Sequence, residues 1–459
     1  MKVWINKEDS SIPEDEWKDS FVFSVNRDTY STIYTSVSKL WYGMDQIEIK
    51  DIYEDLFIIG LCIFAIDKRV SRRQFLDCWT RQLDVSIPVL KLSEWEDCKE
   101  DWNKILGFLT GDIWNITFRQ SDKKYSRHKN SNKKHIDVSA CDCVCLFSGG
   151  LDSYCGAVHL LENGKSPCLV GHNEYPKLRI KQEKFAATFQ QLYPNQKVQF
   201  LGFTANSRAP KDINGNPLKK SENTSRGRSL LFLCTAISIA GILGVDTPVY
   251  IPENGFIGLN IPLTDSRKGT CSTRTTHPYF IREFSKLLKK VNIKNPIYNF
   301  YAFMTKKEVV EDVRNTDAFN EHYEETISCS HPCQARWNRN GNNEYPINCG
   351  YCYPCLIRRS SLQKIRFKKE KYSFDQEFGD FLVDYSRSDK SSDLRAVINS
   401  IYQYKNSTDD EIRRKIRLAG KLSKEDVDNF LLVYKETMGD LESMFDADES
   451  IKKMLGDNK

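Results

Sequence analysis

The chain has 459 residues, of which 40% are hydrophobic and 28% charged, and its formal charge is +5. This length predicts two or three domains, and the composition is typical of globular proteins rather than disordered or fibrous ones. The apolar runs are shorter than a membrane span and the first residues lack the apolar core of a signal peptide, so we expect a cytoplasmic protein with no membrane partner. The mild positive charge does not by itself indicate nucleic-acid binding.

The first 120 residues mix strand-like and helix-like patterns. Residues 83–90 and 112–120 alternate between apolar and polar side chains, whereas residues 94–109 carry an apolar stripe of helical period. We therefore expect an N-terminal α+β accessory domain over residues 1–120, followed by a basic, solvated linker over residues 121–135.

From residue 136 onward, strand patterns alternate with helix patterns. The predicted strands are residues 141–147, 166–174, 197–205 and 247–255, and the predicted helices are residues 151–164, 180–194 and 229–244. Such alternation predicts an α/β domain, here residues 136–325, with a doubly wound parallel sheet that is buried on both faces. The connection over residues 206–228 is long and rich in glycine, proline, asparagine and basic residues, and we expect it to be a mobile cover over the site.

The last part of the chain is charged and amphipathic. Its apolar residues recur with helical spacing, which predicts a helical C-terminal region over residues 366–459. We expect this region to act as a structural cap or as a surface for a partner.

The sequence SGGLDS (148–153) stands where the first predicted strand of the α/β domain ends and a helix begins. Ligands of open parallel sheets bind beyond the carboxyl ends of the strands. Glycines let an anion approach the backbone, a helix N-terminus adds partial positive charge, and the hydroxyls of Ser148 and Ser153 can donate to phosphate oxygens. No lysine follows the glycines, so this is not the phosphate loop of phosphoryl-transfer enzymes. The carboxylate of Asp152 would need Mg²⁺ or a basic group to offset its charge beside phosphates.

This loop resembles the signature of the PP-loop ATP pyrophosphatases, which have an adenine nucleotide α-hydrolase-like fold. The resemblance implies cleavage of ATP between its α and β phosphates and adenylation of a substrate. It implies that Asp152 and Ser153 are catalytic. Arg228, in the sequence GRSLLF (227–232), is our further catalytic candidate, as a contact to phosphate. The ATP-binding residues it implies are Ser148, Gly149, Gly150, Leu151, Asp152 and Ser153.

A cysteine cluster follows near residue 350. In CGYCYPC, the thiols of Cys349, Cys352 and Cys355 are spaced so that they can surround one ion. A tetrahedral zinc needs a fourth ligand, and four protein ligands would make the zinc structural. The candidates for the fourth ligand are Cys329, His331 and Cys333.

These motifs together resemble the 7-cyano-7-deazaguanine synthase (QueC) family. Its pattern is F-SGG-x-DS, then G-R-x-x-x-F, then T-x-x-C followed by CGxCxxC. Here the three motifs read FSGGLDS (147–153), GRSLLF (227–232) and TISC…CGYCYPC (326–355). The resemblance favours Cys329 as the fourth zinc ligand within a zinc-binding segment over residues 326–365. It implies that the carboxylate of a 7-carboxy-7-deazaguanine is adenylated and then transferred to an amine, with ATP, Mg²⁺ and structural Zn²⁺ as cofactors.

The chain departs from that family in length and in one motif. The family's E-D-x-S-G-Y-P-D-C-R-type stretch is replaced by residues 252–280, which still offer polar side chains. Glu253 with Asn254 can read the amidine-like edge of a guanine analogue, and Arg274 can pair with a carboxylate through two hydrogen bonds. The candidate substrate ligands are Glu253, Asn254, Asn260, Thr273, Arg274 and His277.

The long form resembles the QueC-like proteins of bacterial anti-phage systems such as the Qat system. That resemblance implies modification with a deazaguanine, in which the amine belongs to ammonia or to a partner protein from the same operon. Two alternatives stay open. One is tRNA thiolation, which would need a catalytic cysteine such as Cys155 or Cys271; the other is a nucleotide sensor whose zinc element binds nucleic acid in a salt-dependent way.

Overall fold

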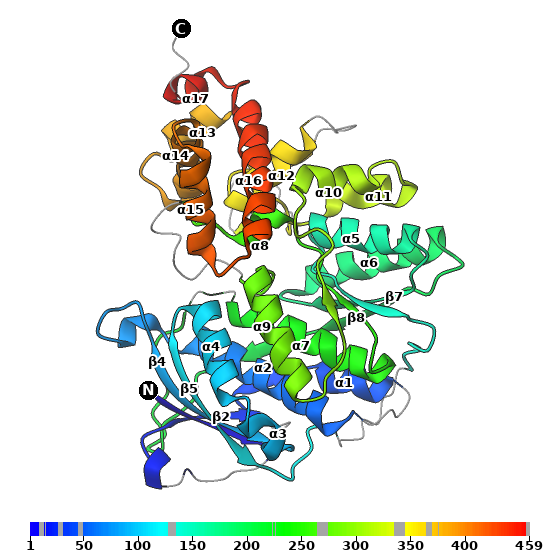
Figure 1. The fold of residues 1–459 in the computed structure, drawn as a ribbon, viewed down its shortest axis with the longest axis vertical. Helices are drawn as coiled ribbons and strands as arrows, with labels where there is room; N and C mark the ends of the chain where they lie inside the picture. The colour runs from blue at the N-terminus through cyan, green and yellow to red at the C-terminus, as the bar shows by residue number, and fades with distance from the viewer. Residues whose placement is uncertain are drawn as a thin grey trace.

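The chain forms two parallel sheets that lie side by side, with a helical region above them (Figure 1). The computed structural model describes residues 1–8, 13, 15–25, 31–44, 49–126, 135–222, 224, 226–263, 274–334, 345–363, 370–374 and 376–455. The α/β class and the parallel sheets predicted from the sequence are confirmed.

The first sheet has the strand order β2-β1-β4-β5, and every pair in it is parallel. Its strands are β1 (Lys2–Lys7), β2 (Phe21–Val25), β4 (Gln82–Val89) and β5 (Ile113–Gln120). The helix α2 (Asp51–Arg69) precedes β4, and α4 (Lys99–Thr110) connects β4 to β5. The expectation of an α+β unit is therefore wrong, because the strands are joined by crossovers rather than by hairpins.

The second sheet has the order β11-β10-β6-β7-β8 and is also parallel throughout. Its strands are β6 (Cys143–Leu146), β7 (Pro167–His172), β8 (Gln199–Phe203), β10 (Val249–Tyr250) and β11 (Ile297–Tyr298). The chain adds strands on one side of β6 and then on the other, so the order reverses between β6 and β10. In sheets of this kind, the ligand crevice lies beyond the carboxyl ends of the strands at that reversal.

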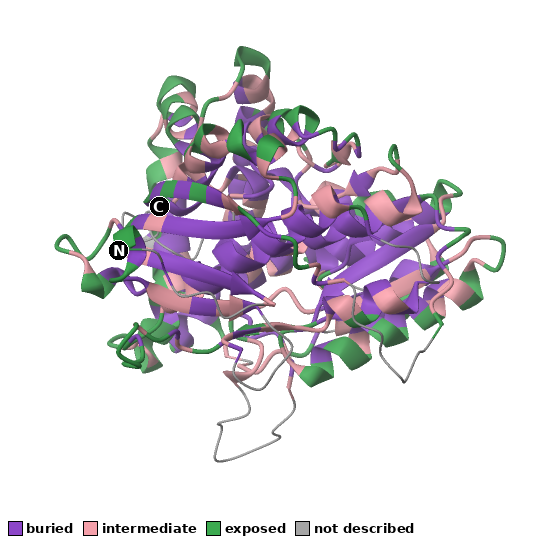
Figure 2. Ribbon diagram, turned by 90° about the horizontal axis from the view of Figure 1, so that it is seen from below, coloured by how far each residue is buried: buried purple, intermediate pink, exposed green. Residues whose placement is uncertain are grey.

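Helices cover both faces of the second sheet. On β6, Val144 and Leu146 face the large core that contains α7, whereas Cys143 and Cys145 face a second core beneath α5 and α6. The helices of this domain are α5 (Leu151–Glu162), α6 (Pro176–Leu192), α7 (Arg226–Leu243), α9 (Pro278–Lys290), α10 (Lys306–Val313) and α11 (Asp317–His322). The strands β6 and β7 are buried along their whole length, whereas β5, at an edge of the first sheet, alternates between buried and exposed residues (Figure 2).

The helix α7 joins the two sheets into one core. It packs against α2 of the first unit, by which we mean residues 1–120, and against β6 and β7 of the second sheet. The shared core runs from Val3 to Ile293. The boundary predicted at residue 120 therefore separates two sheets but not two cores. Within the described part of the chain, α7 is the one helix long and apolar enough to cross a membrane, yet 67% of its residues are buried inside the protein. A helix that is apolar on all sides is expected where both sides are covered.

The connection after β8 ties the second sheet to the first unit. Its β9 (Ala205–Ser207) pairs antiparallel with β3 (Ile33–Thr35), and Lys211 forms a bridge with Val22. The expectation of a mobile cover is wrong for this part, because its backbone hydrogen bonds are made to strands of the first unit.

The C-terminal region is helical, as predicted. Its helices are α13 (Phe378–Asp384), α14 (Ser392–Lys405), α15 (Asp409–Ala419), α16 (Lys424–Phe445) and α17 (Glu449–Met454). The helix α16 packs on α8 (Gly255–Leu259), which follows β10, and on α12 (Tyr353–Leu362). The region thus lies over the carboxyl edge of the second sheet (Figure 1). Two short helices, α1 (Val37–Gly43) and α3 (Leu92–Glu96), complete the first unit.

The crossing of α2 and α7 yields a stability prediction. A Cβ atom at Gly227 would lie 2.9 Å from the Asp67 Cβ and 3.0 Å from the Phe64 Cα, so Gly227→Ala should lower the free energy of unfolding by about 1–3 kcal/mol. At Gly439 of α16, no atom of the described residues lies within 4 Å of where a Cβ atom would be. Gly439→Ala should therefore raise the free energy of unfolding by up to about 1 kcal/mol. Urea denaturation of both variants measures the two free energies of unfolding. Equal changes in the two variants would contradict the close crossing of α2 and α7.

Candidate functional site

The SGGLDS loop forms a tight turn between β6 and α5. Gly149 has a φ of +82°, in the left-handed region that favours glycine. The Oγ atoms of Ser148 and Ser153 lie 3.1 Å apart, and the Ser148 Oγ accepts a hydrogen bond from the Gly150 N–H at 3.3 Å. The Ser153 hydroxyl donates to the Gly150 carbonyl at 3.0 Å. Both serines therefore fix the turn that exposes the backbone.

The start of α5 leaves backbone donors open. Its N-cap residue, Gly150, offers no side chain to cap the helix. Among the described residues, no acceptor lies within hydrogen-bonding distance of the backbone N–H of Gly149, Asp152 or Ser153. Free N–H groups at a helix N-terminus form a binding site for an anion such as phosphate.

Asp152 is buried at this helix start and is paired with a lysine. The Lys306 Nζ lies 2.6 Å from the Asp152 Oδ1, and the Asn254 side-chain amide donates to the Asp152 Oδ2 at 2.8 Å. Burial disfavours the charge of Asp152, but Lys306 and hydrogen bonds from Glu253 and Asn254 hold its pKa below the usual value. Lys306 is thus the basic group that the sequence argument required.

Lys306 was missed because it lies 154 residues away from Asp152 in sequence. It is the first residue of α10, and the preceding Thr305 forms a capping box with Glu308. The sequence TKKE would have predicted a helix start, since Ser or Thr followed three residues later by Glu is typical of one. It would not have indicated which strand end that helix start approaches.

Glu253 and Asn254 join the site from the end of β10. Asn254 also caps α8, because its Oδ1 accepts from the Ile257 N–H at 3.1 Å. Burial, and next the adjacent Asp152 carboxylate, raise the pKa of Glu253 well above its usual value. Burial and the adjacent Asp152 thus favour the neutral form of Glu253, which limits the negative charge around Lys306.

Polar side chains near the end of β7 have atoms that make no hydrogen bond within the described part of the chain. These atoms are the Nε2 of His172, the last residue of β7, and both polar atoms of the Asn173 amide. The Gln182 amide donates to the Phe147 carbonyl at 2.9 Å, while its Oε1 likewise has no partner among the described residues. Burial, with the nearby charges of Arg228 and Lys68, lowers the pKa of His172 to about 3, so its ring is neutral. These side chains were not predicted as part of the site. The polar run HNE (172–174) at the end of a predicted buried strand would have indicated them.

The other predicted residues are placed less centrally. Arg228 is partly exposed and pairs with Glu174, which follows β7. Asn260 ends α8 in the left-handed conformation, with a φ of +53°. Arg274 donates to the Phe108 carbonyl at 3.1 Å, and His277 caps α9 beside the Phe108 ring. Thr273 lies outside the described residues.

The candidate substrate ligands thus form two groups. Glu253 and Asn254 meet Asp152, whereas no hydrogen bond or ion pair among the described residues links Arg274 or His277 to Asp152. Both groups adjoin α8, since Asn254 caps that helix and Thr276, next to His277, approaches its Gly258.

The four predicted cysteines meet in one group. The Sγ atoms of Cys329, Cys349, Cys352 and Cys355 all lie within 4.8 Å of one another, with 3.9 Å between Cys349 and Cys355 and 3.8 Å between Cys352 and Cys329. This group contains Cys329, as the resemblance favoured, and contains neither Cys333 nor His331.

The donor set fits a metal ion such as zinc. With Zn–S bonds of about 2.3 Å, the sulfurs of a tetrahedral site lie about 3.8 Å apart, which agrees with the separations of 3.9 Å and 3.8 Å given above. Backbone N–H groups point at the sulfurs, among them those of His331 toward Cys329 at 3.2 Å and of Cys352 toward Cys349 at 3.2 Å. Such donors stabilise thiolates, so the group can hold a metal ion.

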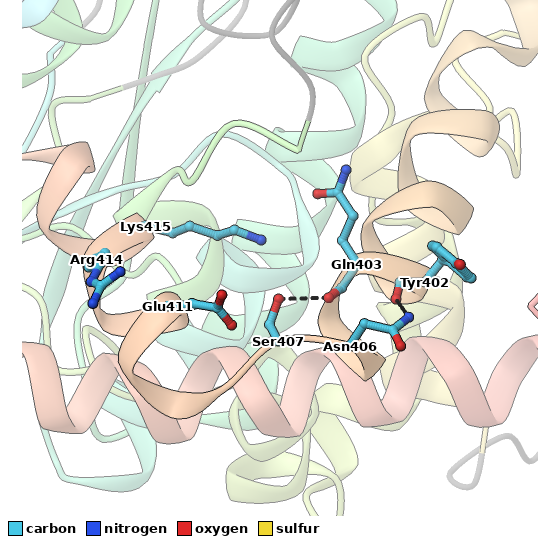
Figure 3. Close-up of a pocket in the computed structure, with 7 residues that line it drawn as sticks. All are labelled: Tyr402, Gln403, Asn406, Ser407, Glu411, Arg414 and Lys415. Atoms are coloured by element: carbon cyan, nitrogen blue, oxygen red, sulfur yellow. Dashed lines mark hydrogen bonds between the residues drawn. The ribbon is translucent and has the colours of Figure 1, made fainter.

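A surface cavity of about 500 Å³ lies elsewhere, between α14 and α15 (Figure 3). It is lined by Tyr402, Gln403, Asn406, Ser407, Glu411, Arg414 and Lys415. Its side chains bond locally, as when Ser407 donates to the Gln403 carbonyl at 2.7 Å. None of the predicted site residues lines it, so it does not coincide with the crevice between β6 and β10.

Comparison of the chain with protein-family models and with curated proteins finds no match. The fold and the site define the class as an α/β protein with parallel sheets that carries a four-cysteine group able to hold a metal ion such as zinc.

The cysteine group yields a prediction about metal content. Cys352→Ser should abolish the bound metal and lower the melting temperature, because the folding energy of the segment depends on the ion. Cys333→Ser should keep one metal ion per chain and the wild-type melting temperature, since Cys333 lies outside the group. Elemental analysis with thermal denaturation measures both, and metal loss in the Cys333 variant would refute the ligand assignment.

Proposed function

We propose that the protein is a QueC-like ligase of bacterial anti-phage defence that adenylates a 7-carboxy-7-deazaguanine-type carboxylate and transfers it to an amine. The observation that carries the proposal is the pairing of Asp152 with Lys306 at the open N-terminus of α5, where the strand order reverses. This crevice offers free N–H donors, two hydroxyls and one lysine to an anion. The motif resemblance then selects ATP among the anions.

In this proposal, the β and γ phosphates of ATP bind residues 148–153. Lys306 and Arg228 offset phosphate charge, and Mg²⁺ held with Asp152 supplies the remaining positive charge. The buried His172 and Asn173, at the end of β7, are the proposed contacts to the purine nucleoside, because an amide presents a donor and an acceptor together.

The reaction proposed has two steps. The substrate carboxylate oxygen attacks the α phosphorus, the bond from that phosphorus to the β-phosphate oxygen breaks, and pyrophosphate leaves. An amine then attacks the acyl carbon, AMP leaves with the bonding electron pair, and the amine loses one proton as the amide forms. Glu253 and Asn254, which meet Asp152, are the proposed contacts to the deazaguanine base. Arg274 and His277 are proposed for a more distant part of the substrate.

Sulfur transfer to tRNA is not favoured by the described residues. Cys155 is buried in α5, and burial raises the pKa of its thiol, whereas a nucleophilic cysteine needs an accessible thiolate. Cys271 lies outside the described residues. Zn²⁺ in the four-cysteine group is proposed to be structural, since four protein ligands leave no open position.

The first test concerns the loop and its lysine. Ser153→Ala and Lys306→Met should each lower pyrophosphate release from ATP by more than about a hundredfold, as loss of preorganised charge and donors does elsewhere. Lys307→Met, at the next position on the same helix, should leave the rate unchanged, because Lys307 pairs with Asp440. Circular dichroism controls for folding, since the lysine variant leaves a buried carboxylate unpaired. A wild-type rate in the folded Ser153 variant would exclude the loop assignment.

The second test identifies the amine. Protein incubated with ATP and 7-carboxy-7-deazaguanine should release AMP and pyrophosphate in equal amounts and give an amide detectable by mass spectrometry. Parallel reactions with ammonia and with each protein encoded beside this chain should show which one gains the deazaguanine mass. Hydrolysis of ATP with no acylated product in any reaction would contradict the proposal.

A further inference from the structure

We infer that the segment leading into the first metal ligand completes the nucleotide loop, so that metal occupancy sets nucleotide affinity. The segment is Ile327–Ser328, which directly precedes Cys329. The inference rests on the proposed binding of ATP at residues 148–153. In this inference, Ser328 positions the nucleotide loop and binds neither the metal ion nor the nucleotide.

Ile327 and Ser328 make the contacts that hold the loop from outside. The Ile327 N–H donates to the Gly149 carbonyl at 2.9 Å, and the Leu151 N–H donates to the Ser328 Oγ at 3.4 Å. The fit is close, because a Cβ atom at Gly150 would lie 3.3 Å from the Ile327 carbonyl oxygen. The segment thus holds the residues on both sides of Gly150, the N-cap of α5.

The same segment is held by residues next to the cysteines. The Ser328 N–H donates to the Asn348 Oδ1 at 2.9 Å, and the Asn348 amide donates to the Thr326 carbonyl at 3.0 Å. Asn348 directly precedes the ligand Cys349. The two metal-binding stretches of chain are therefore joined through one amide side chain.

A buried arginine makes a second connection. Arg358 lies three residues after Cys355 on α12, is fully buried and pairs with Glu370 at 2.7 Å. It donates to the Thr326 Oγ1 at 2.7 Å and to the Ser328 Oγ at 3.3 Å. A hydroxyl oxygen can accept two hydrogen bonds, so Ser328 accepts from Arg358 and from the loop together.

These contacts couple the two sites. Loss of the ion would separate the stretches around Cys329 and Cys349, and the support for Gly149 and Leu151 would be lost with them. Coupling of this kind is reciprocal: if the metal raises nucleotide affinity, then nucleotide raises metal affinity by the same factor.

The decisive variant is Ser328→Ala, with Ser330→Ala as its matched control. The Ser330 N–H donates to the Cys352 Sγ at 3.4 Å, and among the described residues no hydrogen bond joins the Ser330 side chain to residues 148–153. Both variants should keep one metal ion. Ser328→Ala should weaken binding of α,β-methylene-ATP about three- to tenfold in calorimetry, as expected for one lost hydrogen bond, and Ser330→Ala should bind as the wild type does. Wild-type affinity in a metal-loaded Ser328 variant would overturn the inference.

Two readouts separate this inference from the proposed function. Hydrogen exchange of residues 148–153 should speed up in Ser328→Ala but not in Ser330→Ala, without any nucleotide present; equal exchange would overturn the inference. Competition with a zinc chelator should show tighter metal binding when the ATP analogue is present, and unchanged metal affinity would also overturn it. If the wild-type chain binds no analogue, the proposed function fails, while the exchange result still tests how the segment supports the loop.

Discussion

The ion pair between Asp152 and Lys306 is the interaction on which the candidate site depends. A carboxylate buried at the end of a strand would be strongly unfavourable alone, and breaking such a pair typically costs about 3–5 kcal/mol. The pair also joins three separate segments, because Asp152 begins α5, Lys306 begins α10 and Asn254 follows β10. The reversal of strand order brings these helix starts together. The ion pair in turn balances the charges that this arrangement buries.

The first unit supports this arrangement through a second buried network. Asp67, at the end of α2, accepts from Arg81 at 2.6 Å and from the Gly227 N–H at 2.9 Å. Arg81 also pairs with Asp112 at the start of β5. The start of α7 is therefore fixed by charges from the first sheet, and Arg228 is the residue that follows Gly227. The charged network thus gives the first unit a direct, buried connection to the start of α7 rather than a solvated linker.

Local patterns in the sequence were sufficient for most of the α/β domain. The alternation of strands and helices, the turn at Gly149 and the CGYCYPC knuckle each depend on residues close together in the chain, and each was found. The parallel pairing of β1 with β2 and β4 was not predicted, since strand direction depends on crossovers that no short window contains. The same limit explains why Lys306 was missed and why residues 205–211 were taken for a cover.

The placement of Arg274 and His277 follows from a different constraint. Both lie against Phe108 at the end of α4, so this stretch of the chain is anchored on the N-terminal unit. Gly420, between α15 and α16, closes the other side, since a Cβ atom there would lie 2.5 Å from the His277 ring. Arg274 and His277 are thus held where the N-terminal unit, the C-terminal helices and α8 converge, so both outer regions fix this stretch of the chain rather than the SGGLDS loop.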